Sequence, residues 1–205
     1  MTAFPFLSKR QVIYMKKDLG VVQAVFPMPV LMVAAYNEDG TPNEMNAAWG
    51  MICEQDQIAL FLDPEHKTTK NMRTRKAVTD ALADRAHMAE ADFFGTASGN
   101  TMPDKFARSG LTARKSAFVD APVVEEFPVV MECELIDVIE KGSFFCAVGR
   151  IVNTAADERV LNEKGKIDAT KLDALMFDTF GHGYYSVGEK AGQAWNAGAG
   201  LMKKA

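Results

Sequence analysis

The 205-residue chain is poor in the residues that build metal centres and disulfides. Its three cysteines, Cys53, Cys133 and Cys146, are far apart, no Cys-x-x-Cys pair occurs, and there are only three histidines. Structural zinc sites usually take their ligands from closely spaced pairs, so the sequence argues against one. Cys133 and Cys146 lie in apolar runs and are expected to be buried thiols in a reducing compartment. Cys53 is expected to be a packed thiol as well.

The chain also lacks strongly basic segments and long hydrophobic runs. The formal net charge is -4, and no basic stretch is interleaved with aromatic residues, so nucleic-acid binding has little support. The longest apolar runs are too short to cross a bilayer, and the first ten residues contain no apolar signal region. These absences predict a cytoplasmic protein with neither nucleic acid nor membrane as a partner.

Apolar residues make up 48% of the chain, which is enough to bury the core of one domain. We expect a single domain over residues 1–205, with an N-terminal arm (1–26), a main body (27–188) and a C-terminal tail (189–205). Residues 21–26 form a candidate lead-in strand. Strands at about 30–36, 46–53 and 57–62, separated by short turns, predict an antiparallel meander.

The rest of the chain predicts a few helices and one long hairpin. Residues 67–75 fit a helix capped by Asp63 or Thr68, residues 77–83 fit either strand or helix, and residues 87–94 fit a helix. Long strands at 128–139 and 144–152 are joined by a turn, and a short helix is expected at 170–176. The sequence therefore predicts a mainly β protein with some α, whose sheet closes into a barrel or dimerises to cover its edges.

Two polar segments indicate a ligand site. The first, Asn43-Glu44-Met45-Asn46-Ala47-Ala48-Trp49, lies on the return strand of a predicted hairpin, and its small residues beside amides let a flat ligand approach the backbone. The second, residues 63–71, carries hydroxyls and lysines at the start of a helix, which suits a phosphate. Together they predict a flat, phosphorylated cofactor.

A third segment, Ser98-Gly99-Asn100-Thr101-Met102-Pro103-Asp104-Lys105-Phe106, adds a loop and a mobile cation. The three segments, in this order, resemble the flavin reductase-like FMN-binding split-barrel family, in particular its flavoredoxin-like branch. Further short motifs carry the resemblance, among them Gly110-Leu111-Thr112, Asp120-Ala121-Pro122 and Gly149-Arg150-Ile151-Val152. It covers about Pro27 to Gly188. It implies an antiparallel, Greek-key-like split β-barrel that binds FMN and forms a homodimer.

The resemblance also implies which residues bind the cofactor. Those expected along the flavin ring are Asn43, Asn46, Ala47, Ala48 and Trp49, and those expected at the phosphate are Lys67, Thr68 and Thr69. Ser98 and Lys105 would reach the cofactor from their loop, and Phe177 would cover the ring from the C-terminal part. These assignments have alternatives. A tryptophan on a strand often fills a core, and a polar helix start is often only solvated. Aromatic residues near a C-terminus often fix the tail to the core. We expect no metal and no catalytic side chain, because the flavin itself carries the redox chemistry.

One departure from the family pattern bears on the electron donor. Many relatives have a histidine at the start of the second long strand, where this chain has Phe144. Phenylalanine cannot donate a hydrogen bond near a flavin or a nicotinamide, so FMN binding is implied more strongly than direct oxidation of NAD(P)H. The leading hypothesis is a flavin reductase-like oxidoreductase that receives electrons from NAD(P)H or a redox protein. The alternatives are a flavoredoxin-type carrier without its own small-molecule substrate and a non-redox FMN-binding barrel.

Overall fold

The computed structural model describes residues 15–202. One seven-stranded antiparallel sheet forms the body, with the strand order β3-β2-β6-β9-β10-β5-β4. Its strands are β2 (Leu31–Tyr36), β3 (Pro42–Ala47), β4 (Gly50–Glu54), β5 (Gln57–Phe61), β6 (Ala77–Leu82), β9 (Val129–Lys141) and β10 (Phe144–Ala156). The expected mainly β, antiparallel architecture is confirmed.

The two edge strands of this sheet, β3 and β4, follow each other in the sequence and are linked only by Ala48 and Trp49. Three peptide steps separate the Cα atoms of Ala47 and Gly50, which can therefore lie at most about 11 Å apart. Because the two edges must meet at this link, the sheet has to roll into a barrel. The predicted candidate site therefore lies at the seam where the two edges meet.

The predicted meander over residues 30–62 is wrong. The hairpins β2–β3 and β4–β5 both form, but β3 and β4 lie at opposite ends of the strand order instead of pairing. The predicted strand at 46–53 is interrupted at Ala48 and Trp49, where the chain passes from one edge to the other. The peptide N–H of Phe61 donates to the Trp49 carbonyl (2.8 Å), which fixes this break against β5.

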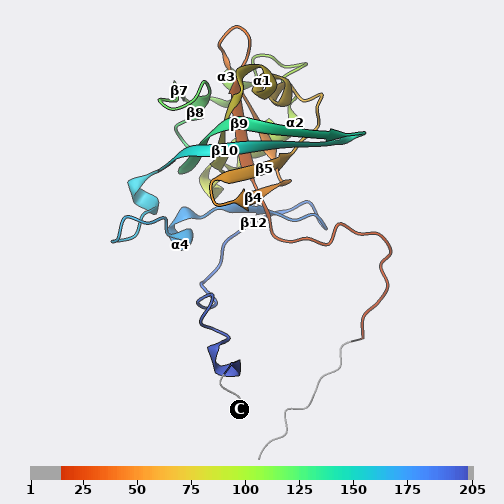
Figure 1. The fold of residues 1–205 in the computed structure, drawn as a ribbon, viewed down its shortest axis with the longest axis vertical. Coiled ribbons are helices and arrows are strands. Elements are labelled where there is room, and N and C mark those ends of the chain that lie inside the picture. Colours follow the sequence, from red (N-terminus) through yellow and green to blue (C-terminus); the bar gives the residue numbers. More distant parts are fainter. Residues whose placement is uncertain (1–14, 203–205) are drawn as a thin grey trace, which may run out of the picture.

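The long hairpin was predicted correctly. Strands β9 and β10 have thirteen residues each and pair with two register shifts, and Figure 1 shows the hairpin projecting beyond the neighbouring strands. The segment that fitted either strand or helix is β6, which lies between β2 and β9 in the sheet. Its side chains are almost all buried, which explains why its apolar pattern shows no clear alternation.

The helices cover the barrel at two places. Helix α1 (Lys67–Arg75) follows β5, and α2 (Met88–Thr96) confirms the helix expected at 87–94. The predicted caps of α1 are wrong: its N-cap residue is His66, which makes no side-chain capping bond, while Asp63 accepts from the Glu65 N–H before the helix begins. Helix α3 (Lys105–Ser109) and the small hairpin β7 (Ala113–Lys115) and β8 (Pro122–Val124) complete this part of the chain.

A small second sheet orders the C-terminal part. It consists of β1 (Met28–Pro29), β11 (Leu175–Phe177) and β12 (Tyr184–Ser186). Of the helix expected at 170–176, only α4 (Ala169–Leu172) forms; it ends at Asp173, in a left-handed conformation, and β11 follows. The lead-in strand expected at 21–26 is absent from the described residues, where that segment is exposed and irregular.

The chain ends and three short 3-10 helices complete the fold. These helices are η1 (Arg85–His87), η2 (Glu158–Val160) and η3 (Ala199–Leu201). Figure 1 shows the segment before β1 and the chain after β12 leaving the body on the same side. The described part of the predicted arm and tail contains η3 and otherwise no helix or strand. Residues 1–14 and 203–205 lie outside the described residues.

The two faces of the sheet bury two separate cores. Leu31 and Val33 of β2 point into the barrel, where Met72 of α1 closes the core. The alternating residues Met32 and Ala34 point outward to a second core, which α2 and α3 cover. The sheet is therefore buried on both sides along β2 and β6, and α2 and α3 are fixed against its outer face.

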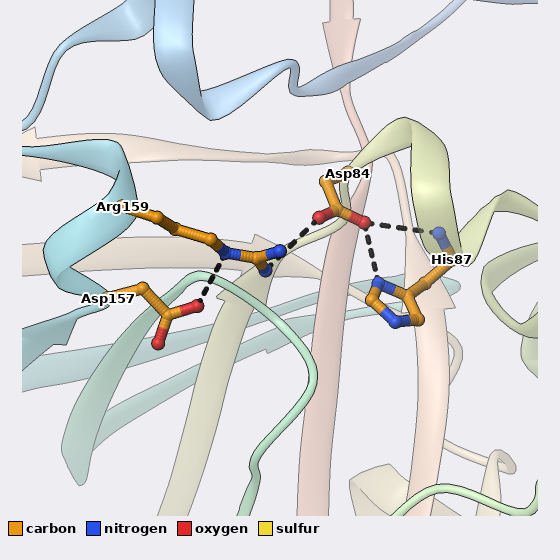
Figure 2. A network of polar contacts seen from close by, with 4 residues as sticks. All are labelled: Asp84, His87, Asp157 and Arg159. Carbon is orange, nitrogen blue, oxygen red and sulfur yellow. Dashed lines mark hydrogen bonds and ion pairs between the residues drawn. The ribbon is translucent and has the colours of Figure 1, made fainter.

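A charged network fixes the start of α2. Asp84, which is 5% exposed, accepts a hydrogen bond from the His87 N–H (3.1 Å), and its Oδ1 lies 2.7 Å from His87 Nδ1. Arg159 approaches the other oxygen of Asp84 (3.5 Å) and also pairs with Asp157 (2.9 Å). Figure 2 shows the Asp84 carboxylate between His87 and Arg159. The network ties η1 to η2 and so positions the helix whose other end lines the site.

Candidate functional site

Asn43 joins three elements at one edge of the barrel. The residue is 3% exposed, and its Nδ2 donates to the Thr68 hydroxyl of α1 (2.7 Å). On the other side, a Cβ added to Gly99 would overlap Asn43 Oδ1 and would lie 3.1 Å from Lys67 Cβ. Only glycine therefore allows the loop after α2 to approach β3 and α1 this closely. Asn43 acts as a structural anchor around which the rest of the site is built.

The beginning of α1 is an open site for an anion. The first N–H groups of a helix lack partners within the helix and form the positive end of its dipole. Here the N-cap, His66, provides no side-chain acceptor, and the first turn has no acidic residue. His66, Lys67 and Thr68 line a cavity of about 220 Å³ at this end. Peptide N–H groups and a lysine at a helix start are a common way to hold a phosphate.

Lys105, the first residue of α3, lines the same cavity. It is only 3% exposed, and its Nζ donates to the Ala97 carbonyl at the end of α2 (2.9 Å). The ammonium also lies 5.7 Å from the centre of the Phe94 ring, a cation–π arrangement. Burial lowers the pKa of Lys105 to about 8, while the nearby Glu44 acts in the opposite direction. A positive charge is therefore held in a largely dry place beside the cavity.

The phosphate cavity, as we call it, is the cavity of about 220 Å³ between α1, β3, the end of α2 and α3. Five residues expected from the sequence line it, from three separate segments: Asn46, Lys67, Thr68, Ser98 and Lys105. The lining residues outside the three segments that the sequence indicated are Phe94, Gly95, Thr96 and Ala97. They belong to the end of α2, where the apolar pattern indicates packing rather than a site.

A second hollow of about 210 Å³ opens beside the phosphate cavity. We call it the aromatic hollow, because Trp49, Phe177 and Tyr184 contribute to its lining. The Phe177 ring centre lies 6.4 Å from that of Trp49 and 6.1 Å from that of Tyr184. Trp49 is 46% exposed, so it does not only fill the core. Ala48 lines the same hollow, which places a small residue beside three aromatic rings.

Asn46 stands between the two spaces, which share it together with Gly95 and Thr96. Its Nδ2 donates to the Ala91 carbonyl of α2 (3.1 Å) and lies 3.5 Å from the Tyr184 hydroxyl. That hydroxyl donates in turn to Asp92 (3.1 Å), and burial together with Asp92 raises the pKa of Tyr184. The polar and the aromatic parts of the site are therefore continuous.

Three of the expected residues, Asn43, Ala47 and Thr69, line neither space. Asn43 is the buried anchor described above. Ala47 is buried in the barrel core. Thr69 is fully buried in α1, and its hydroxyl has no hydrogen-bond partner among the described residues. Phe144, at the start of β10, packs its half-exposed ring against Phe61 instead (5.7 Å). No described helix combines the length and the apolar character that a membrane crossing requires.

Solved structures share the overall fold of this chain. The structure is similar to the flavoredoxin of Desulfovibrio vulgaris (Miyazaki F), with a TM-score of 0.85 and 38% identity over 90% of this chain and 100% of that one. It has the same fold as a flavoredoxin from Methanosarcina acetivorans, with a TM-score of 0.81 and 22% identity over 91% and 100% of the two chains.

Sequence comparison identifies the family. An uncharacterized protein of Aeropyrum pernix is 28% identical over 141 residues, or 67% of this chain, and the match spans about half (53%) of that relative's length. The family model described as "Flavin reductase like domain" matches residues 23–180. This match covers more than half of the chain and every lining residue of the two cavities except Tyr184, so the chain belongs to the flavin reductase-like family.

Proposed function

We propose that the protein binds FMN and passes electrons through it. The observation that carries this proposal is the continuity of the phosphate cavity with the aromatic hollow through Asn46. One part offers a helix N-terminus and two lysines, as a phosphate requires, and the other offers aromatic surface and small residues, as a flat ring requires. The family membership of the chain supports the same ligand class.

The residues divide into two groups by their chemistry. The phosphate of FMN would be held by the α1 N-terminus with Lys67 and Thr68 and by Lys105, and the ring would lie near Asn46, Ala48, Trp49 and Phe177. FMN supplies the redox chemistry when it is bound. The protein's part is to orient the ring, to exclude water with the aromatic side chains and to offer amide donors at its polar edge.

The proposed activity is that of a flavin reductase-like oxidoreductase with NAD(P)H or a redox protein as the electron donor. The second candidate is an electron carrier of the flavoredoxin type. Two observations favour the carrier: the 38% identity to the Desulfovibrio flavoredoxin and the phenylalanine at position 144. Turnover separates the two, because an enzyme consumes NADH or NADPH with free flavin as acceptor, whereas a carrier needs a protein donor.

The experiment that tests FMN binding is a visible absorption titration of the purified protein. We expect a bound-flavin spectrum, either as purified or after addition of FMN, with one FMN per chain. FAD and riboflavin serve as comparison ligands, since riboflavin lacks the phosphate and should bind more weakly. A protein that leaves the FMN spectrum unchanged at every concentration would contradict the proposal.

We also propose that the protein is a homodimer. Strand β4 is an unpaired edge of the sheet, and its Met51, Ile52 and Cys53 side chains are all exposed. The expectation that Cys53 is a packed thiol is therefore wrong. Exposed apolar edge strands tend to be covered by another chain. Further apolar side chains, Ile139 of β9 and Phe144 of β10, are about half exposed at the tip of the long hairpin. A second copy of the chain is the partner that would cover them.

A further inference from the structure

Glu44 is a buried carboxyl group for which the proposed function provides no role. It lies in the middle of β3, is 0% exposed, and neither of its carboxyl oxygens has a hydrogen-bond partner among the described residues. A buried carboxylate without a partner is costly, so this group must be protonated or balanced by a charge. Its position suggests that the carboxyl group is balanced by a nearby charge as well as protonated.

Glu44 lies on the face of β3 that carries Asn46, because side chains of a strand alternate. Its cross-strand neighbour on β2 is the uncharged Ala34, which belongs to the outer core. Helix α3 packs against β3 on this face, and the first residue of that helix is Lys105. Lys105 lines the phosphate cavity, whereas Glu44, on the strand against which its helix packs, does not.

Few charged groups surround Glu44 and Lys105. Lys105 lowers the pKa of Glu44, Glu126 raises it, and burial dominates, so that the pKa of Glu44 rises to about 8. Elsewhere on α3, Arg108 is exposed and paired with Asp104, and on α2 the exposed Asp92 is bonded to Tyr184. Lys105 is thus the cation that acts on Glu44, and both groups change charge in the same pH range.

We propose that Glu44 is a proton-accepting partner of Lys105, so that binding of a phosphate ester in the phosphate cavity is coupled to proton uptake by this buried pair. This inference rests on the proposed function, in which that cavity takes the phosphate of FMN. Glu44 would not contact the ligand. It would act indirectly, through its effect on the charged group of Lys105.

The proton balance of the step is simple. At mildly alkaline pH the free protein carries Glu44 largely as a carboxylate opposite Lys105. A bound phosphate dianion attracts the ammonium group and repels the carboxylate. Glu44 therefore takes up a proton from the buffer, forming a carboxylic acid O–H bond, and the fraction of Lys105 that is a neutral amine takes up a proton from the buffer to form the ammonium group that faces the phosphate. No redox change accompanies this step.

Asp80 provides a matched control inside the same sheet. It is also a fully buried acid, and both of its oxygens lack partners among the described residues. Its pKa is raised by burial alone, with no lysine contributing. It pairs across the sheet with Val33, whose side chain points into the barrel, so it lies on the face opposite to Glu44. Asp80→Asn therefore removes a buried acid without touching the proposed pair.

The first experiment measures proton uptake on FMN binding. Calorimetric titrations at about pH 8.5, where a phosphate ester is a dianion, are run in two buffers of different ionisation enthalpy. We expect clear proton uptake by the wild type, less by Glu44→Gln, and the wild-type value for Asp80→Asn. Equal uptake by the wild type and Glu44→Gln would overturn the inference while leaving FMN binding intact.

The second experiment observes the carboxyl group directly and does not depend on FMN. Infrared spectra of the ligand-free proteins at about pH 8.5 should show a stronger carboxylic acid band in Lys105→Met than in the wild type, because Glu44 then has no cation and stays protonated. The increase should be absent from the double variant Lys105→Met/Glu44→Gln, in which only the contribution of Asp80 remains. An unchanged band in Lys105→Met would overturn the inference. If no protein bound FMN, the proposed function would fall, and this infrared comparison would still decide whether the pair exists.

Discussion

Lys105 is the residue on which the phosphate part of the site most depends, because it is a cation held almost without contact with water. We expect Lys105→Met to weaken FMN binding by about 1–3 kcal/mol, the usual scale for a hydrogen bond to a charged group. Fluorescence quenching of added FMN measures the affinity. Lys164→Met, which removes an exposed lysine between η2 and α4, is the control and should bind like the wild type. Equal affinities in both variants would remove Lys105 from the phosphate site.

Gly99 determines how closely the loop after α2 approaches β3 and α1. A methyl group at this position would overlap the Asn43 side chain, so we expect Gly99→Ala to push the Ser98–Gly99 loop away from α1. The affinity for FMN should fall by about tenfold or more, equivalent to about 1.4 kcal/mol, while the fold remains. Gly188→Ala is the matched control, because nothing lies within 4 Å of its added Cβ. Thermal unfolding of both variants separates a loss of binding from a loss of structure.

At the scale of elements, the short-range signals in the sequence predict the structure well. The Asn-Glu-Asp-Gly turn before Thr41 and the Lys-Gly turn before Ser143 both form hairpins where they were expected. Helix α2 and the beginning of α1 also follow from local pattern, although the caps of α1 do not, because His66 gives no side-chain cap and its position reflects packing instead.

Long-range strand order could not be predicted in the same way. Ala48 and Trp49 look like the interior of a strand, and only the pairing of β4 with β5, together with the outer position of β3, shows that the chain changes edges there. The same holds for the site. The motif residues of β3, α1 and the Ser98 loop were predicted, but the end of α2 was not, because its role depends on which helix reaches that edge.

The exposed edge β4 leads to a prediction about assembly. We expect Met51→Lys with Ile52→Lys to convert the proposed homodimer into a monomer, since two charges on an edge strand oppose pairing with another edge. Light scattering at micromolar concentration measures the mass. Phe118→Lys, which changes an exposed apolar residue of the loop between β7 and β8, should leave the mass of the dimer unchanged. A wild-type protein that is already monomeric would contradict the dimer proposal.

For the molecule as a whole, Asp80 makes stability depend on pH. Burial raises the pKa of this carboxyl group well above its ordinary value, so the folded state prefers its protonated form. Below the pKa of about 3.9 that an aspartate has in the unfolded chain, both states are protonated and the fold bears no penalty. As the pH rises above that value, the unfolded chain releases its proton first, so the free energy of unfolding decreases until the folded pKa is passed.

Asp80→Asn should remove much of this dependence, because an amide does not ionise. We expect the variant to be more stable than the wild type by about 1–3 kcal/mol near pH 8, the scale of an unsatisfied buried polar group. At pH 4 and below the two should differ little. Urea unfolding of both proteins across this pH range measures the effect. Glu44→Gln should show a smaller effect of the same sign, since Lys105 already offsets part of the cost of ionising Glu44. Parallel stability curves for wild type and Asp80→Asn would mean that Asp80 reaches water or a cation in the folded protein.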